Sequence, residues 1–558
     1  MKKVGLTILF VSFLTLINAQ ALFDGGTGFT RADSLRGTLT PLRTCYDVVF
    51  YDLYVDINHK DQSLIGNNTI VFKTMADFEQ LQVDLSSKLE IDSIVYNKKQ
   101  LKYTREFNAV FIKFPATVKK GGVERIKIYY HGFPTVAKMA PWDGGLVFSV
   151  DKDGKPWLAV ACEGIGASAW WPCKDHLSDE PDSMAISGPA PKGLQFISNG
   201  RLRKSYNLKD GREVNSWFVS YPINSYNATY YIGNYENFSD TYTSPTGKKL
   251  DLDYYVMPYN IDKARKQFEE VKPMMKCFEQ YFGPYPFWKD GYKLVESPYL
   301  GMEHQSAIAY GNDYKNGYAG IDFSGYGLQY DFIIIHESGH EWWGNNITMA
   351  DMADMWISEG FCTYSEVVYV ECRYGPKDAL KYINYKKKSV ENDRPVIGAY
   401  GVNNEGSGDM YNKGALMIHT LRAVINNDKL FFDILLGLQK DFSLKQVTTD
   451  DIVNYYNTKT GLNLTPIFNQ YLKYTAIPAF EYTLKTSGDK TQFMYRWKAD
   501  VKDFAMPVDV FVAYGGKEAP RRITPTTDWQ TMVLMGEGIA PTIKVDTDHY
   551  YIKVSKPE

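Results

Sequence analysis

The spacing of apolar residues changes twice along this chain, and that order limits the architectures it can adopt. At 51–57 apolar side chains alternate with more polar ones, the period-two pattern of a strand with one buried face. Helix-type spacing then takes over, and alternation returns after Pro478, as at 493–497. The sequence therefore predicts a multidomain α+β protein, with a β-rich domain at 20–238, a mostly α domain at 239–477 and a C-terminal β-sandwich at 478–558.

Capping residues and prolines set the expected helix boundaries. Asp262 can cap a long amphipathic segment that ends at Gly283, with prolines just beyond, a conventional stop signal. Pro273 lies inside this segment and should kink it, because proline interrupts the hydrogen bonding of a helix. Thr465 is expected to cap a further helix, with Pro466 at its first position. The remaining helices are predicted at 330–343, 354–373, 412–425 and 430–439.

Composition is that of an ordinary globular protein. Apolar residues make up 44% and charged residues 23% of the 558 residues, which excludes a disordered, collagenous or coiled-coil protein. The formal net charge is −3 and no block of lysine and arginine is present. We therefore expect no nucleic-acid partner.

The first residues have the pattern of a secretory signal peptide. Lys2 and Lys3 precede an apolar run at 4–17, and Ala19 stands before a plausible cleavage point. The run is shorter than the roughly 20 residues that span a bilayer, and no polar face interrupts it, which disfavours a buried first helix. Residues 1–19 are therefore expected to be removed, leaving a periplasmic or secreted protein without membrane association.

Six cysteines in 558 residues do not make a disulfide scaffold, although an oxidising compartment permits bridges. Cys362 and Cys372 fall in one predicted helix. Ten residues at 1.5 Å each separate them by about 15 Å, which is too far for a disulfide. A bridge between Cys162 and Cys173 remains open from the sequence.

Two of the eight histidines lie four residues apart, in His336-Glu337-Ser338-Gly339-His340. On a helix they share one face, so both rings can bind one Zn²⁺ while Glu337 lies beside the open coordination position. Gly339 costs about 1 kcal/mol relative to alanine in a helix, which predicts close packing at that point. The alternative is a pair of core histidines that bind nothing.

A catalytic zinc ion takes three protein ligands and leaves one position for water. The next predicted helix carries Glu359, with 18 residues between it and His340. On spacing alone, Glu359 is one candidate among several acids, including Glu366.

The wider sequence around these residues resembles one family. HESGHEWWGN at 336–345, followed by WISEGF at 356–361, is similar to the zinc aminopeptidase family of aminopeptidase N and the leukotriene hydrolases. The family motif is HExxH, 18 residues, then Glu. The resemblance implies a saddle-like N-terminal domain, a thermolysin-like catalytic domain and one Zn²⁺ per chain. The implied zinc ligands are His336, His340 and Glu359, with Glu337 as general base.

Glu366 matches a family glutamate seven residues past the third ligand. From the sequence, a place behind the ligands and a solvated helix face are equally open.

An aminopeptidase must also bind the free amine of its substrate, which requires carboxylates. Gly301, Met302 and Glu303 resemble the family's Gly-Ala-Met-Glu-Asn segment, about 33 residues before the metal helix. The resemblance implies that Glu303 binds the amine and that the Gly301–Met302 backbone pairs with the peptide. Leu300 and His304 depart from the family pattern; a histidine is able to carry a pH-dependent charge, and the sequence leaves open whether His304 does so near the amine.

Glu163 is the expected second amine-binding carboxylate. It lies nine residues before Pro172 and matches a family position upstream of a Pro-Cys motif. The acidic run at 179–182 is interpreted as a solvated turn and not as a metal site.

One of the 42 tyrosines has an implied role. The run Tyr411-Asn412-Lys413-Gly414 opens a predicted helix and resembles the family's Tyr-x-Lys-Gly segment. Tyr411 is then the donor to the carbonyl oxygen on which negative charge develops during hydrolysis.

Together these features imply a zinc metalloaminopeptidase that removes the first residue of peptides with a free N-terminus. Three alternatives remain. A thermolysin-like endopeptidase would share the zinc ligands but not need Glu163 and Glu303. A leukotriene-type epoxide hydrolase would share the site, but those enzymes end in a helical domain and this tail reads as strands. A non-catalytic binding protein would normally have lost Glu337 or Tyr411.

Overall fold

The structure is a computed structural model that describes residues 28–322, 324–536 and 539–557. The predicted signal peptide at 1–19 lies outside the described residues. None of the helices within the described ranges is long and apolar enough to cross a membrane.

The N-terminal region is built mainly of strands, as the alternating pattern predicts. Two short helices, α2 (Arg31–Gly37) and α3 (Pro41–Thr44), precede an eight-stranded sheet of order β13-β14-β11-β1-β2-β8-β4-β5. Alternate residues of β1, such as Leu53 and Val55, are fully buried because one face of the sheet covers the core. The strands of this sheet are β1 (Tyr46–Asn58), β2 (Ser63–Thr74), β4 (Leu89–Tyr96), β5 (Lys99–Gln100), β8 (Val123–Gly132), β11 (Ser183–Ala190), β13 (Arg201–Asn207) and β14 (Glu213–Val219).

Two smaller sheets complete this region. A three-stranded sheet contains β3 (Phe78–Asp84), β6 (Lys102–Glu106) and β7 (Ala109–Val118). A four-stranded sheet of order β12-β15-β10-β9 contains β9 (Gly145–Val150), β10 (Pro156–Ala161), β12 (Gln195–Ser198) and β15 (Tyr230–Gly233).

A five-stranded sheet joins this region to the helices. Its order is β16-β17-β18-β20-β19, so the two-residue strand β19 (Gly301–Met302) lies at one edge and pairs with β20 on one side only. An edge strand has free backbone groups to which an extended peptide can add. The other strands are β16 (Glu236–Thr243), β17 (Lys249–Val256), β18 (Tyr292–Glu296) and β20 (Ile308–Tyr310).

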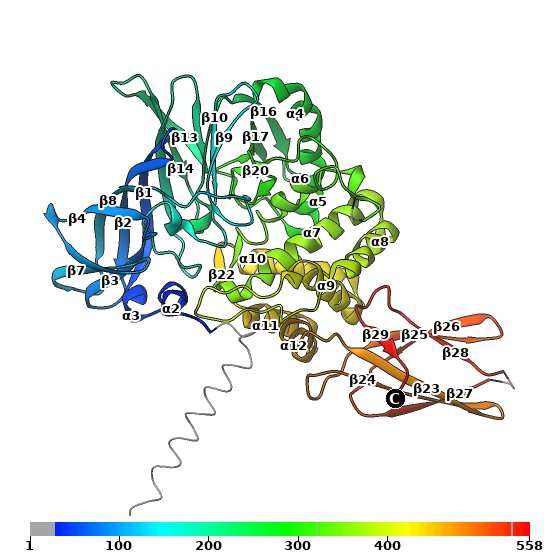
Figure 1. Ribbon diagram of the computed structural model, residues 1–558. Coiled ribbons are helices and arrows are strands. Elements are labelled where there is room, and N and C mark those ends of the chain that lie inside the picture. The colour runs from blue at the N-terminus through cyan, green and yellow to red at the C-terminus, as the bar shows by residue number, and fades with distance from the viewer. Residues whose placement is uncertain (1–27, 323, 537–538, 558) are drawn as a thin grey trace, which may run out of the picture.

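The helical region lies between the N-terminal sheets and the C-terminal strands (Figure 1). A short parallel pair, β21 (Ile347–Met349) and β22 (Lys445–Val447), lies among its helices. The helices are α4 (Ile261–Gln267), α5 (Val271–Phe282), α6 (Phe332–Gly339), α7 (Trp356–Tyr374), α8 (Pro376–Lys386), α9 (Asn412–Ile425), α10 (Asp428–Asp441), α11 (Thr449–Thr460) and α12 (Thr465–Lys473).

The predicted helix at 412–425 has the bounds of α9, but the helix capped by Asp262 differs from its prediction. It is two helices, α4 and α5, joined by a 3-10 turn at Phe268–Glu270, and Asn260 occupies the cap position. The break comes before Pro273, which lies in the first turn of α5, where a missing N–H is tolerated. Thr465 is likewise one residue inside α12, whose cap position is Leu464.

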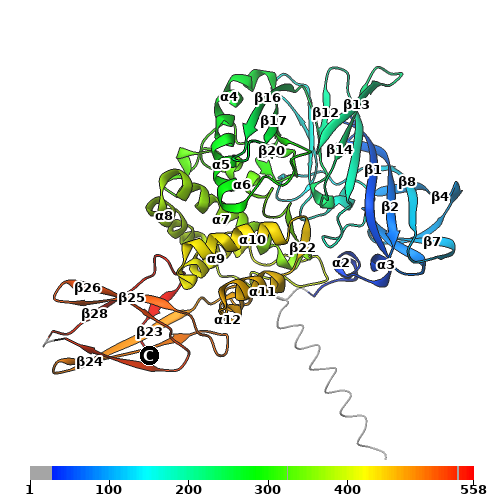
Figure 2. The same ribbon diagram turned by 180° about the vertical axis from the view of Figure 1, so that it is seen from behind.

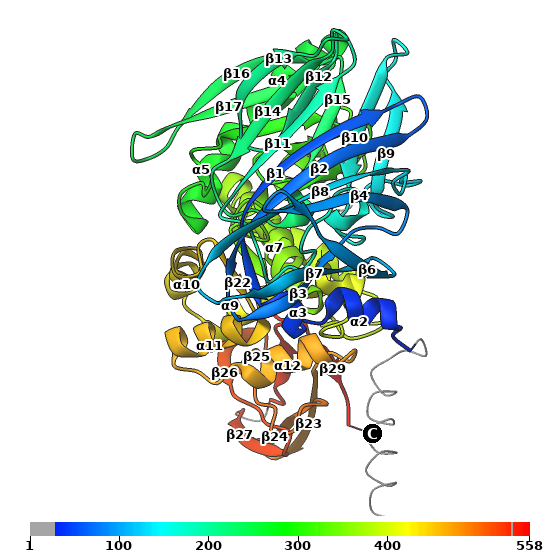
Figure 3. The same ribbon diagram turned by 90° about the vertical axis from the view of Figure 1, so that its left-hand side faces the viewer.

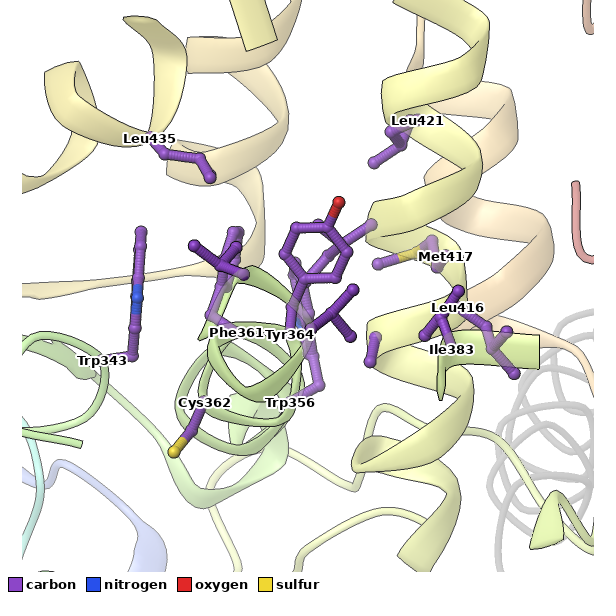
Figure 4. Close-up of a cluster of buried hydrophobic side chains, with 14 of the residues drawn as sticks. Trp343, Trp356, Phe361, Cys362, Tyr364, Ile383, Leu416, Met417, Leu421 and Leu435 are labelled. Carbon is purple, nitrogen blue, oxygen red and sulfur yellow. The ribbon is translucent and has the colours of Figure 1, made fainter. Parts of the chain in front are cut away.

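Helix α7 is the centre of the helical region. Every residue from Trp356 to Val370 is buried, because α5, α6, α8 and α9 pack around it. Figure 4 shows α7 viewed near its axis, with Leu416, Met417 and Leu421 of α9 facing Tyr364. A helix buried on all sides is fixed in position, so its polar side chains have fixed positions too.

One disulfide links two of these helices. Cys277 of α5 is bonded to Cys372 of α7, across 95 residues of sequence. Cys162 and Cys173, whose pairing the sequence left open, are buried free thiols.

The chain ends in two sheets, in agreement with the predicted β-sandwich. One has the order β27-β24-β23-β29 and the other β26-β25-β28. Their apolar side chains belong to the same continuous core as those of the helices, and the two sheets lie at one end of the molecule, beyond α11 and α12 (Figures 2 and 3). The strands are β23 (Ala479–Ser487), β24 (Lys490–Lys498), β25 (Val508–Tyr514), β26 (Lys517–Ile523), β27 (Gln530–Met535), β28 (Thr542–Val545) and β29 (Lys553–Ser555).

The interpretation of 179–182 as a solvated turn is wrong for its first two acids. Asp179 is buried and forms an ion pair with buried Lys174. Glu180 is 8% exposed, and burial raises its pKa to about 7. Asp182 is exposed. The sequence pattern did not reveal this, because the pair is buried by the tertiary fold, in which Lys174 Nζ also donates to the backbone oxygen of Tyr46 in β1.

Glu180→Gln is expected to remove a pH-dependent loss of stability. The folded pKa of Glu180, about 7, lies above the unfolded value of about 4.3, so the folded state holds the proton more tightly. The free energy of unfolding therefore falls as the pH rises through this interval, by on the order of 4 kcal/mol from this group. The variant should gain thermal stability over the wild type at pH 8 and gain less at pH 5. Equal differences at both pH values, or the same behaviour in the exposed-site control Glu236→Gln, would contradict this assignment.

Candidate metal and substrate site

The first histidine of the motif, His336, lies on α6, and the second, His340, is the C-cap residue of that helix and continues its right-handed helical backbone. Asp331 accepts hydrogen bonds from the backbone N–H groups of Ile333 and Ile334 at 3.1 and 3.3 Å, which satisfies two donors of the first turn. His336 and His340 are four residues apart, and their Nε2 atoms lie 3.3 Å from each other. A helix therefore presents both nitrogens to one point, as the spacing predicts.

Glu359, in the first turn of α7, supplies the third donor atom. Its Oε2 lies 3.6 Å from His336 Nε2 and 3.5 Å from His340 Nε2. The edges of a tetrahedral zinc site with Zn–N and Zn–O bonds near 2.1 Å are about 3.4 Å long. This oxygen is buried and has no hydrogen-bond partner. The donor set therefore fits Zn²⁺.

Burial opposes ionisation of Glu359, but the adjacent His340 and His336 outweigh it and lower the pKa of this carboxyl to about 2. The carboxylate form, which a metal requires, is thus the one held in the site.

A thiol lies near the same histidines. Ligand atoms of His336, His340 and Cys362 all fall within 4.8 Å of one another. The Cys362 Sγ, however, donates to the backbone oxygen of His336 at 2.9 Å. It is engaged with the backbone of α6, so Glu359 completes the donor triangle better than Cys362 does.

The second nitrogen of each histidine also has a partner. His336 Nδ1 lies 2.8 Å from Glu366 Oε1, and His340 Nδ1 lies 2.9 Å from the backbone oxygen of Trp343. With Nδ1 donating, Nε2 is left as the metal-binding nitrogen in both rings. Glu366 is buried, so the alternative of a solvated helix face is wrong.

Glu337 lies beside the donor triangle and against the edge strand β19. A Cβ atom added to Gly301 would lie 2.6 Å from Glu337 Oε1, so only glycine leaves room for this carboxyl. Burial, opposed by the neighbouring His336, raises the pKa of Glu337 to about 7. A carboxyl of this kind can both accept and release a proton near neutral pH.

Glu303 and Glu163 approach each other from different parts of the fold. Glu303 follows β19, is 3% exposed, and its Oε1 accepts a hydrogen bond from Tyr226 at 3.0 Å. Burial and the neighbouring Glu303 carboxylate raise the pKa of Glu163, whose Oε1 is buried without a hydrogen-bond partner. Two carboxylates held together in this way form a binding site for a cation.

His304 does not bring a titrating charge to this pair. Its ring is fully buried and its Nδ1 lies 2.8 Å from the hydroxyl of Tyr231. Burial lowers the pKa of His304 to about 3, so the ring is neutral at physiological pH. The structure therefore answers the question that the sequence left open: His304 brings no pH-dependent charge to this position.

Tyr411 reaches the site from the start of α9. A Cβ atom added to Gly414 would lie 3.1 Å from Gly360 Cα, so the backbones of α9 and α7 meet at these two glycines. This contact brings the Tyr411 ring to 6.3 Å from the His336 ring, centroid to centroid. Burial raises the pKa of Tyr411 well above its ordinary value, so the phenol keeps its proton and can donate it in a hydrogen bond.

All of the predicted site residues line one cavity of about 470 Å³. Their elements are distant in sequence, from the N-terminal sheets to α9. The residues are Glu163, Gly301, Met302, Glu303, His336, Glu337, His340, Glu359 and Tyr411.

Sequence reasoning missed other residues of this site. Tyr226 donates to Glu303, and Trp142 and Lys386 line the cavity. Tyr226 is one of 42 tyrosines and stands 77 residues before Glu303. No local pattern distinguishes these residues, because the tertiary fold alone brings them to the cavity.

Comparison with known proteins shows which family the helical region of this chain resembles. Residues 266–471 match the Peptidase family M1 domain. The matched segment covers a little over a third of the chain and is similar to peptidase family M1. This confirms the resemblance to the aminopeptidase N family, and an M1 zinc metallopeptidase from Deinococcus radiodurans has the same fold, with a TM-score of 0.65 at 19% identity over 77% of this chain and 95% of that one.

The curated relatives that match this chain are longer than it is. Endoplasmic reticulum aminopeptidase 1 of Mus musculus is 24% identical over 53% of this chain and 32% of its own length. Leucyl aminopeptidase of Saccharolobus solfataricus is 22% identical over 77% of this chain and 53% of its own length. The chain thus spans about a third to a half of the length of these relatives.

Proposed function

We propose that this protein is a zinc metalloaminopeptidase that removes the N-terminal residue of peptides. The observation that carries the proposal is the presence, in one cavity, of a metal-binding triangle and a separate pair of carboxylates, Glu163 and Glu303. A peptidase that cuts within a chain has no use for the pair. The match of residues 266–471 to peptidase family M1 supports the same reaction, and so do relatives that are named as aminopeptidases.

His336, His340 and Glu359 would hold one Zn²⁺ per chain. When bound, the ion supplies a Lewis acid that polarises the scissile carbonyl and acidifies water. Side chains of the protein would carry out the proton transfer and stabilise the developing charge. Glu337 accepts the proton of the attacking water and passes it to the leaving amine. The Tyr411 hydroxyl donates to the carbonyl oxygen as negative charge develops there.

Other residues of the cavity would position the substrate. Glu163 and Glu303 would accept hydrogen bonds from the α-ammonium group, each worth roughly 1.5–3 kcal/mol. The Gly301–Met302 backbone of β19 has a free edge along which an extended peptide would lie. Anchoring the amine at a fixed distance from the metal triangle limits cleavage to the first peptide bond.

We further propose that the protein is exported and acts in the periplasm or outside the cell. The signal-peptide pattern at 1–19 and the disulfide between Cys277 and Cys372 support this location. N-terminal sequencing of the mature protein should begin after Ala19. A mature protein that retains Met1 would overturn the proposal.

Glu337→Gln is expected to separate metal binding from turnover. The variant keeps all three ligands, so it should bind one zinc ion per chain, while kcat/KM for an aminoacyl-anilide falls roughly 100- to 10,000-fold. Zinc content by elemental analysis and initial rates measure the two quantities. Glu359→Gln should lose both zinc binding and turnover, whereas Cys362→Ala should keep both. Near wild-type turnover in Glu337→Gln would show that Glu337 is not the general base.

Glu303→Gln is expected to lower kcat/KM only for substrates that carry a free amine. Glutamine keeps an acceptor for Tyr226 but loses the negative charge, so kcat/KM for a free dipeptide anilide should fall by about 10- to 150-fold. Rates on the matched N-acetylated substrate, already low, should not change. An equal loss on both substrates would contradict the amine-binding role and would favour an endopeptidase.

A further inference from the structure

Glu366, the carboxylate behind His336, is itself held from the other side by α8. Its Oε1 lies 2.8 Å from His336 Nδ1. Its Oε2 accepts a hydrogen bond from Tyr382 at 2.6 Å and pairs with Lys386 Nζ at 2.7 Å. Both oxygens are therefore engaged, one by the metal-ligand ring and one by two side chains of α8.

The placement of these groups follows from helix geometry. Glu366 lies seven residues, two turns, after Glu359 on α7, so both carboxylates share one face of that helix. Tyr382 and Lys386 are four residues apart on α8 and likewise share a face. The two faces meet because α7 packs directly on α8.

Lys386 is unusual among the groups around the cavity. It is the one lysine or arginine among the described residues that line the cavity, against six glutamates. Its side chain is 12% exposed, and that of Glu366 is 1% exposed. An ion pair this deeply buried has few alternative partners, so it fixes the orientation of the carboxylate.

We propose that Lys386 is a positioning residue for the metal site: with Tyr382 it fixes Glu366, which orients the His336 ring so that Nε2 faces the metal. The inference rests on the proposed metal site but not on the identity of the substrate. With Oε2 fixed, Oε1 cannot rotate away from His336 Nδ1. A carboxylate that accepts from the far nitrogen of a ligand imidazole sets its orientation and raises its basicity.

The sign of the effect separates this role from simple electrostatics. A positive charge near the site repels a metal cation, so removal of Lys386 by that effect alone would tighten metal binding. Loss of the fixed carboxylate weakens metal binding instead, because the ring is no longer held. The two explanations predict opposite changes in the zinc dissociation constant.

The test measures zinc binding by the metal-free protein, in competition with a chromophoric chelator and without any peptide. Lys386→Met should raise the dissociation constant by about 10- to 100-fold, and Lys386→Arg should restore most of the affinity. Lys388→Met, at an exposed position two residues further along, is the matched control and should bind like the wild type. Unchanged or tighter binding in Lys386→Met would overturn the proposal.

A double-mutant cycle tests whether Lys386 acts through Glu366. In the Glu366→Gln background, Lys386→Met should have no further effect on the dissociation constant. Additive losses would overturn the proposal, as would a lower unfolding midpoint of the metal-free Lys386→Met protein with an unchanged dissociation constant.

If Lys386→Met does not fold, Tyr382→Phe removes a hydrogen bond from the same oxygen and should weaken zinc binding several-fold. Zinc affinity equal to that of the wild type in Tyr382→Phe would then overturn the proposal. Since no peptide is present in any of these measurements, failure of the aminopeptidase proposal would leave their outcome unaffected.

Discussion

The close contact between α6 and α7 is the constraint on which the rest of the site depends. A side chain at Gly339 would lie 2.4 Å from Ser365 Oγ, so the two helices can meet only at a glycine. That contact sets Glu359 beside two imidazoles whose own separation is fixed by one helical turn. Glycine costs about 1 kcal/mol relative to alanine in a helix, and its small size here permits the helix contact that gives a donor triangle with edges of 3.3–3.6 Å.

Local spacing was enough to predict the parts of the site that lie within one element. The two histidines share a face of α6 because a helix places residues four apart together, and the bounds of α9 follow from its periodicity and flanking turns. Glu359 needed the family resemblance, since spacing alone left several acids possible. The same resemblance brought Glu163 to notice, about 140 residues before Glu303 along the chain.

What the sequence did not give is the burial and partners of polar groups. Glu366 and Glu180 are both buried, and each has polar partners that are distant in sequence. His304 matched no family residue, and its neutrality follows from complete burial against Tyr231. A one-dimensional pattern records which residues alternate or repeat, but not which polar atoms the tertiary fold removes from water.

The position of β19 at the edge of its sheet has a further consequence. Gly301 and Met302, which offer the free backbone edge, are directly followed in the chain by Glu303, which lines the same cavity. Under the proposed function, three consecutive residues would supply both the backbone pairing and one amine-binding carboxylate, while their distance from the metal-binding triangle depends on how β19 packs against α6.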